Sequence, residues 1–136
     1  MAAPPRIALD SGALIALAHG NVDARAHLRR WVSEGSAVLV PVPVLAETLR
    51  GSARDASVER ILNREGIQFI SVSQSAARRA GCLLGAAKLP ASETMDALIV
   101  ATALEGGATD IITSDSRQFR SLAGIAANII ELRSIV

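Results

Sequence analysis

The feature that most constrains this chain is a short apolar run from Ile7 to Ile15, which a single carboxylate, Asp10, interrupts. An apolar run that leads through Ser11 and Gly12 into a helical pattern is typical of a buried parallel strand and its crossover helix. Ligands of open α/β sheets bind at the carboxyl ends of such strands. A buried carboxylate also needs a partner, because burial of an unpaired charge is costly. Asp10 is therefore the first candidate functional residue.

The composition favours one cytoplasmic domain that spans residues 1–136. Half of the residues are apolar and 20% are charged, which argues against disorder. Aromatic residues make up only 2% of the chain, so Ala, Leu, Ile and Val must build the core. The apolar stretch that ends at Ala18 is too short to span a bilayer, and Cys82 has no second cysteine to pair with. We therefore expect no membrane-spanning segment and no disulfide.

The order of the predicted elements indicates a doubly wound, mostly parallel sheet. Apolar runs predict strands at residues 6–9, 37–40, 67–70, 108–113 and 128–132. Helical patterns lie between them, at residues 13–19, 23–34, 43–51, 56–65, 74–87, 95–104 and 116–122. Ser11 and Ser73 are the predicted caps of the first and the longest helix. Strands that alternate with helices in this way are typical of an α/β fold.

Four acids fall at or just beyond the ends of predicted strands or on the crossover helices, namely Asp10, Glu47, Asp96 and Asp115. In a doubly wound sheet, we expect them to converge at the carboxyl ends of the strands. Crowded carboxylates repel one another, and a bound divalent cation removes that cost. Oxygen ligands without a His or Cys set select a hard ion, Mg²⁺ or Mn²⁺. One or two such ions can activate water for attack on a phosphodiester.

Two of these acids have simpler interpretations. Glu47 could equally be an exposed residue that pairs with Arg50 or Arg54 along its helix. Asp96 could complement the dipole of its helix, although Thr94 or Ser92 is the better predicted cap. Asp96 is the one charge on an otherwise apolar helix, so we favour a functional role for it.

The segments around the four acids resemble the four acidic motifs of PIN domains, and most of all those of VapC-type toxins of type II toxin–antitoxin pairs. The segments are Leu-Asp-Ser-Gly-Ala-Leu at 9–14, Val-Leu-Ala-Glu-Thr-Leu-Arg-Gly at 44–51, Met-Asp-Ala-Leu-Ile-Val-Ala-Thr-Ala-Leu at 95–104 and Ile-Ile-Thr-Ser-Asp-Ser-Arg-Gln-Phe at 111–119. The resemblance covers almost the whole chain, and its strength lies in the order and spacing of the motifs.

The resemblance implies a three-layer α/β/α PIN-like fold with a central, mostly parallel sheet of four to five strands. It also implies a Mg²⁺- or Mn²⁺-dependent endoribonuclease with one or two bound ions. By motif, the catalytic and metal-binding residues are Asp10, Glu47, Asp96 and Asp115, and the polar side chains beside them are Ser11, Thr113 and Ser114. The implied partners are an RNA substrate, a cognate VapB-like antitoxin and a second copy of the chain. The first motif departs from the commoner Asp-Thr-Ser, because Gly12 lacks a hydroxyl.

RNA binding has to rely on arginine. The net charge is only +1, and three aromatic residues cannot form a stacking platform for successive bases. We expect contacts from guanidinium groups to phosphates near the acidic motifs, and an affinity that falls steeply with salt. The candidate residues are Arg50, Arg54, Arg117 and Arg120.

Two other interpretations are a receiver-like phosphorylation module and a catalytically silent, Mg²⁺-binding interaction domain. A receiver needs paired acids after its first strand, where Asp10 stands alone. It also has no use for an acid at the position of Asp115, after the fourth strand. Glu93 and Asp110 are further acids near the motifs, and we expect both to be peripheral.

Overall fold

The computed structural model describes residues 3–114, 116–124 and 126–131, and it contains one five-stranded sheet. The strands are β1 (Arg6–Leu9), β2 (Ala37–Pro41), β3 (Ile67–Ile70), β4 (Asp110–Thr113) and β5 (Asn128–Glu131). The helices are α1 (Ser11–Ala18), α2 (Val22–Ser33), α3 (Pro43–Thr48), α4 (Asp55–Leu62), α5 (Gln74–Ala87), the short 3-10 helix η1 (Ala91–Glu93), α6 (Thr94–Glu105) and α7 (Ser116–Ala123).

All strand pairs are parallel, in the order β3-β2-β1-β4-β5. The chain runs outward from β1 to β2 and β3, then returns to the other side of β1 as β4 and β5. The carboxyl ends of β1 and β4 therefore lie next to each other at the point where the strand order reverses, which is the usual ligand position of such sheets. The register pairs Leu9 with Ile112, so the residues that follow the two strands emerge side by side.

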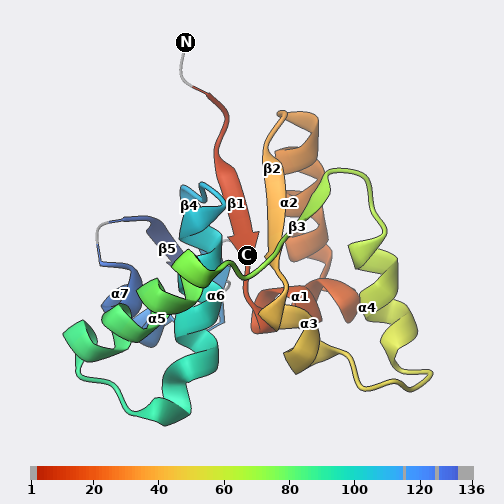
Figure 1. The fold of residues 1–136 in the computed structure, drawn as a ribbon. Helices are drawn as coiled ribbons and strands as arrows, with labels where there is room; N and C mark the ends of the chain where they lie inside the picture. Colours follow the sequence, from red (N-terminus) through yellow and green to blue (C-terminus); the bar gives the residue numbers. More distant parts are fainter. Residues whose placement is uncertain (1–2, 115, 125, 132–136) are drawn as a thin grey trace.

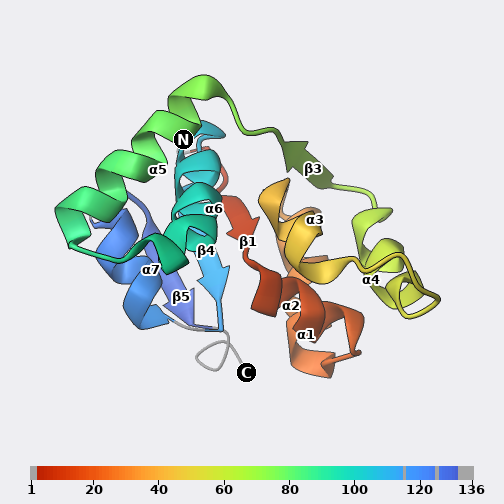
Figure 2. The same cartoon turned by 60° about the horizontal axis from the view of Figure 1, so that its bottom comes forward.

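Helices flank the sheet, as the doubly wound pattern predicts (Figures 1 and 2). Helices α5, α6 and α7 pack against one another, and α7 also contacts the edge strand β5. Helix α2 packs against β2, and α1 contacts both α3 and α4. Helices α1 and α3 begin where β1 and β2 end, so their first turns face the reversal point of the sheet. No helix in the described part of the chain is long and apolar enough to cross a membrane.

The core consists mainly of aliphatic side chains, as the composition requires. The central strands β1, β2 and β4 are almost fully buried, whereas Gln68 and Phe69 on the edge strand β3 are exposed. Helix α6 is apolar on most of its surface and buries six of its twelve residues, because it lies between the sheet and α5. This rigid centre carries the residues that follow β1 and β4.

Most predicted elements agree with the structure, and the main error concerns the start of α1. The predicted cap, Ser11, is already the first helical residue, and Asp10 is the true N-cap. The longer carboxylate side chain of Asp10 reaches the backbone nitrogen of Ala13 at 2.7 Å. Helix α3 ends at Thr48, earlier than predicted, because Leu49 has an extended backbone. The predicted Ser73 cap is confirmed by its side-chain bond to the Ala76 nitrogen.

Candidate active site

Three of the four predicted acids line one cavity at the carboxyl edge of the sheet. The cavity has a volume of about 180 Å³, and its lining residues are Asp10, Ser11, Gly12, Glu47, Asp96, Ile99, Ser114 and Phe119. Asp10 follows β1, Glu47 belongs to α3, Asp96 lies in the first turn of α6 and Ser114 follows β4. The fourth predicted acid, Asp115, lies outside the described residues.

Asp10 is held in place by hydrogen bonds from both neighbouring segments. Its side chain is almost buried, with 5% of the residue exposed. Oδ1 accepts a hydrogen bond from the Ala13 nitrogen, and Oδ2 accepts one from the Thr113 hydroxyl at 2.5 Å. The backbone N–H of Ser114 donates a further bond to this carboxylate. Asp10 therefore caps α1 and lines the cavity at the same time.

The surroundings of Asp10 disfavour its charged form. Burial raises the pKa of the Asp10 carboxyl above its usual range. The hydrogen bonds from Thr113, Ala13 and Ser114 oppose this increase, while the negative charge of Glu47 adds to it. A positive charge in the cavity would favour ionised Asp10 and reduce its repulsion with Glu47.

Glu47 faces the cavity and bonds to α1. The Ser11 hydroxyl donates a hydrogen bond to Glu47 Oε1 at 2.5 Å, which joins the first turn of α1 to α3. Among the residues that the structure describes, Glu47 forms no ion pair with Arg50 or Arg54. The Arg50 guanidinium instead donates to the carbonyl oxygens of Ala46 and Leu49 at the end of α3. The ion-pair interpretation of Glu47 is therefore wrong.

Asp96 projects into the same cavity from α6. It is the third residue of this helix, and the residue before the helix, Glu93, provides no side-chain cap. The prediction that Thr94 or Ser92 caps α6 is wrong, because the Thr94 hydroxyl donates backward to the Ala91 carbonyl at 2.6 Å. Ile99, which was not among the predicted site residues, lies one turn after Asp96 and forms part of the cavity wall. Its spacing of three residues from Asp96 is the signal that could have identified it.

The chemistry of the cavity fits a hard divalent cation. Its charged lining residues are all carboxylates, and no His or Cys is among them. Oxygen ligands of this kind suit Mg²⁺ or Mn²⁺. In the described ranges, however, no three His, Cys, Asp or Glu residues form a compact group that could hold a metal ion. Asp10, Glu47 and Asp96 thus share a cavity without forming a ready-made ligand cluster.

The candidate RNA-binding arginines lie outside this cavity. Arg50 and Arg54 line a larger cavity of about 500 Å³ next to α1, which also includes Ile15 and His19. The Asp55 carboxylate accepts backbone hydrogen bonds from Arg50 and Gly51, and so anchors the segment between α3 and α4. These backbone bonds lower the pKa of Asp55.

The other two candidates, Arg117 and Arg120, are exposed on α7. The same helix carries Phe119, which is 4% exposed and forms part of the wall of the acidic cavity. The two arginines are therefore close in sequence to a cavity-lining residue.

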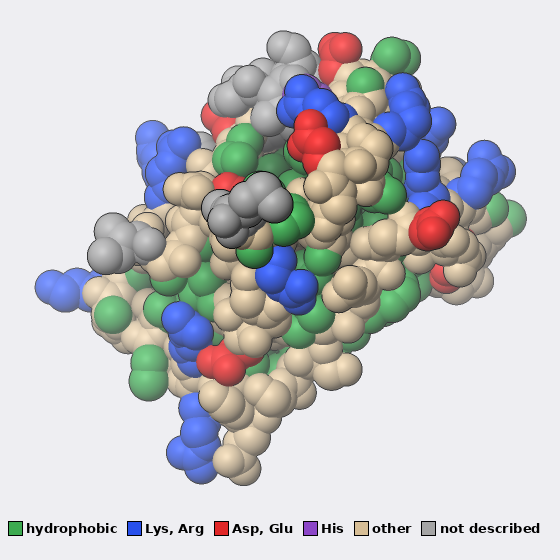
Figure 3. Space-filling model, turned by 90° about the horizontal axis from the view of Figure 1, so that it is seen from above, with side chains coloured by type: hydrophobic (Ala, Val, Ile, Leu, Met, Phe, Trp, Pro, Cys, Tyr) green, Lys and Arg blue, Asp and Glu red, His purple; other side chains and the backbone are tan. Residues whose placement is uncertain are grey.

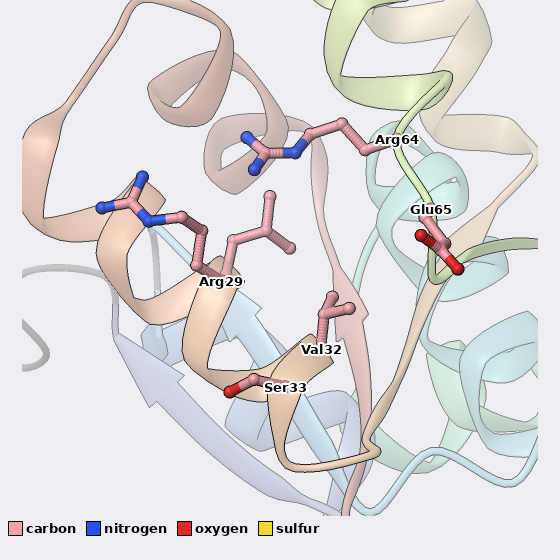
Figure 4. A pocket seen from close by; sticks show the side chains of 6 residues that line it. Arg29, Val32, Ser33, Arg64 and Glu65 are labelled. Atoms are coloured by element: carbon pink, nitrogen blue, oxygen red, sulfur yellow. The ribbon is translucent and has the colours of Figure 1, made fainter.

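A further cavity, of about 330 Å³, carries basic side chains but none of the candidate acids. It lies beside α2, and its lining residues are Leu28, Arg29, Val32, Ser33, Arg64 and Glu65 (Figure 4). Lys and Arg side chains are also scattered among acidic ones over the face at the amino ends of the strands (Figure 3).

The two acids predicted to be peripheral do not line the acidic cavity. Asp110 begins β4, at the opposite end of the sheet, where it accepts hydrogen bonds from the Thr109 hydroxyl and the Asn128 amide. The Glu93 carboxylate accepts a hydrogen bond from the Gln118 side chain, which links η1 to α7. Both carboxylates therefore have structural partners of their own.

The protein is thus a parallel α/β domain with a cavity at the carboxyl edge of its sheet. Carboxylates from three separate segments line this cavity. The sequence model of the PIN domain family matches residues 7–125. The chain belongs to the PIN domain family, and the predicted PIN-like α/β fold is confirmed.

Solved structures of toxin–antitoxin proteins share this fold. VapBC2 from Rickettsia felis, bound to a promoter DNA fragment, has a TM-score of 0.71 at 15% identity, over 92% of this chain and 97% of that one. A toxin–antitoxin complex from Klebsiella pneumoniae has a TM-score of 0.66 at 26% identity, over 88% and 92%. Mycobacterium tuberculosis VapC20, a Sarcin-Ricin loop cleaving toxin, has a TM-score of 0.57 at 20% identity, over 77% and 86%. Comparison with the sequences of curated proteins gives no match.

Proposed function

We propose that this chain is a Mg²⁺- or Mn²⁺-dependent endoribonuclease that acts as the toxin of a toxin–antitoxin pair. The observation that carries the proposal is the cavity shared by Asp10, Glu47 and Asp96, in which burial and a neighbouring charge raise the pKa of Asp10. Membership of the PIN family and the fold shared with VapC20, a toxin that cleaves the Sarcin-Ricin loop, support the same conclusion.

Asp10, Glu47 and Asp96, together with Asp115, are the residues that would hold the cation. When bound, the ion supplies charge stabilisation for phosphodiester hydrolysis and activates water at neutral pH. The protein's own contribution is to orient the ligands. The Ala13 nitrogen and the Thr113 hydroxyl fix the two oxygens of Asp10, and the Ser11 hydroxyl fixes Glu47.

We also propose that phosphate contacts hold the RNA beside the acidic cavity. Arg54, Arg117 and Arg120 are exposed, whereas the guanidinium of Arg50 donates hydrogen bonds to backbone carbonyls. Arg54 and Arg117 are therefore better candidates for direct contact than Arg50.

The proposed regulator is a VapB-like antitoxin that covers the acidic cavity. The Klebsiella neighbour is a toxin–antitoxin complex, and the Rickettsia neighbour is VapBC2 bound to a DNA fragment from their promoter. A cytoplasmic homodimer of the toxin remains part of this proposal. Sedimentation of the purified chain, alone and with a coexpressed antitoxin, measures both assemblies.

The direct test is cleavage of RNA by the purified chain in Mn²⁺ or Mg²⁺. We expect Asp10→Asn and Asp96→Asn each to lower the cleavage rate by more than about 100-fold, because a ligand matters more than its hydrogen-bond partners. Asp23→Asn, which changes an exposed acid in the first turn of α2, is the matched control and should leave the rate unchanged. Excess EDTA should abolish cleavage.

Two results would contradict the proposal. Cleavage by Asp10→Asn and Asp96→Asn at the parental rate would show that these carboxylates do no chemistry. Binding of Mn²⁺ by a chain freed of any antitoxin, without cleavage of any RNA offered, would favour the silent interaction domain.

A further inference from the structure

The side chain of Ser114 fills the space beside the Gly12 Cα at the wall of the acidic cavity. A Cβ atom on residue 12 would lie 2.8 Å from the Ser114 Cβ and closer still to the Ser114 Oγ. No side chain can therefore be added at position 12 while Ser114 keeps its present position. The Ser114 side chain fills the place that a residue at position 12 would otherwise take.

Backbone conformation does not explain the glycine. Gly12 is the second residue of α1 and is not among the glycines with positive φ. Alanine and serine are both more favourable than glycine within a helix. The requirement at this position is therefore steric, and it comes from Ser114 at the end of β4.

The Ser114 hydroxyl is placed on the Asp10 side of the cavity. The point that a Cβ on residue 12 would occupy lies 3.6 Å from Asp10 Oδ1, and the Ser114 Oγ is also within 4 Å of that point. The backbone N–H of Ser114 already donates to the Asp10 carboxylate. Ser114 is exposed and lines the cavity, so its hydroxyl is open to a ligand there.

Two carboxylate oxygens of this cavity accept hydrogen bonds from hydroxyl groups. Thr113 donates to Asp10 Oδ2, and Ser11 donates to Glu47 Oε1. Asp10 Oδ1 receives its bond from the backbone of Ala13 and lies 3.6 Å from the point that a Cβ on residue 12 would occupy. Outer hydrogen bonds of this kind orient metal ligands and tune metal affinity.

We propose that Ser114 is a positioning residue that supplies, from the end of β4, the hydroxyl that Gly12 cannot supply from α1. This hydroxyl orients Asp10 and the water around a divalent cation in the cavity. The inference rests on the proposed metal dependence and adds a pair of positions to it. Of residues 12 and 114, one carries the hydroxyl and the other must be glycine.

The first test is the affinity of the purified chain for Mn²⁺, measured by calorimetry without RNA. We expect Ser114→Ala to weaken Mn²⁺ binding by about tenfold or more, in line with outer hydrogen-bond partners of other metal sites. The melting temperature of the metal-free protein should change little. Ser75→Ala, an exposed serine on α5, is the matched control and should bind Mn²⁺ as the parent does.

The second test exchanges the two residues. Gly12→Ser alone should lower the melting temperature of the metal-free protein, because the two side chains then overlap. The double variant Gly12→Ser with Ser114→Gly removes the overlap and places the hydroxyl on α1. We expect it to recover the parental melting temperature and to bind Mn²⁺ within about threefold of the parent, since a hydroxyl again lines the same part of the cavity.

The outcomes separate this inference from the proposed function. If the parent binds Mn²⁺ and Ser114→Ala binds it equally well, Ser114 only fills space and the inference is wrong, while the metal site stands. Recovery of the melting temperature without recovery of Mn²⁺ affinity in the double variant also overturns it. A parent that binds no Mn²⁺ overturns both proposals.

Discussion

The hydroxyl of Thr113 donates a hydrogen bond of 2.5 Å to Oδ2 of Asp10, and so joins two residues that are 103 positions apart in the chain. Both residues are buried, at the adjacent carboxyl ends of β4 and β1. The bond stabilises the charged form of a carboxylate that burial otherwise disfavours. It therefore couples the fold of the central strands to the charge of the candidate site.

The substitution Thr113→Val tests this coupling. It keeps the shape of the side chain and removes the donor, so the Asp10 carboxylate loses a bond in a buried setting. We expect the free energy of unfolding at neutral pH to fall by about 1.5–3 kcal/mol, the usual contribution of a hydrogen bond to a charged group. Urea denaturation in the presence of EDTA measures the change without a contribution from metal.

Thr102→Val is the matched control for this prediction. Thr102 is fully buried in α6, and its hydroxyl has no hydrogen-bond partner among the described residues. Removal of an unpaired buried hydroxyl should be neutral or stabilising. Equal losses of stability in Thr102→Val and Thr113→Val would show that the effect of Thr113 is packing alone.

Asp10→Asn should change how stability depends on pH. The pKa of Asp10 is raised in the folded protein, so above the ordinary value of 3.8 the folded state holds more of this proton than the unfolded state does. The ionisation therefore lowers stability as pH rises through that window. We expect the melting temperature of the variant, relative to that of the parent, to increase as pH rises above 3.8 in EDTA. A constant difference between about pH 4 and pH 8 would contradict the raised pKa.

Asp55→Asn should have the opposite pH dependence. Backbone hydrogen bonds from Arg50 and Gly51 lower the pKa of Asp55, so its ionisation stabilises the folded state above the ordinary value of 3.8. That stability is lost as pH falls through the lowered pKa. The variant should melt below the parent at neutral pH, and the gap should close in acid. A gap that widens in acid would show that Asp55 does not anchor this segment through its charge.

Arg54→Ala and Arg117→Ala should weaken RNA binding and its dependence on salt. Each phosphate contact that is lost should reduce the slope of log affinity against log salt by about 0.7. The measurement is RNA binding at several salt concentrations in an Asp10→Asn background, which prevents cleavage. Arg29→Ala, in the separate cavity beside α2, is the control. RNA affinity that stays flat from low to moderate salt would contradict binding through arginine–phosphate contacts.

Asp115→Asn tests the one predicted acid that lies outside the described residues. If Asp115 is the fourth ligand, Asp115→Asn should weaken Mn²⁺ binding by at least about tenfold, the effect of removing a hydrogen-bond partner of a metal ligand. Asp110→Asn is the control, since Asp110 lies at the other end of β4. Calorimetric titration compares the two variants, and parental Mn²⁺ affinity in Asp115→Asn would remove this residue from the site.

Much of the fold could be predicted because its signals are local. The apolar runs that became β1 and β3 have the predicted bounds, and Ser73 caps α5 as expected. The errors came where two local preferences competed. Ser11 and Asp10 are both good N-caps, and only the position of the strand end decided that Asp10 takes the role while Ser11 turns to Glu47.

By itself, the sequence determined the order of strands and helices, and it predicted from that order that Asp10, Glu47 and Asp96 come together at the carboxyl edge of a parallel sheet, where they line one cavity. The tertiary structure alone decided what surrounds them. Steric exclusion between Gly12 and Ser114, and the burial that raises the pKa of Asp10, arise only when β1 and β4 lie side by side. Contacts across about a hundred residues depend on atomic distances, which no local pattern of residues encodes.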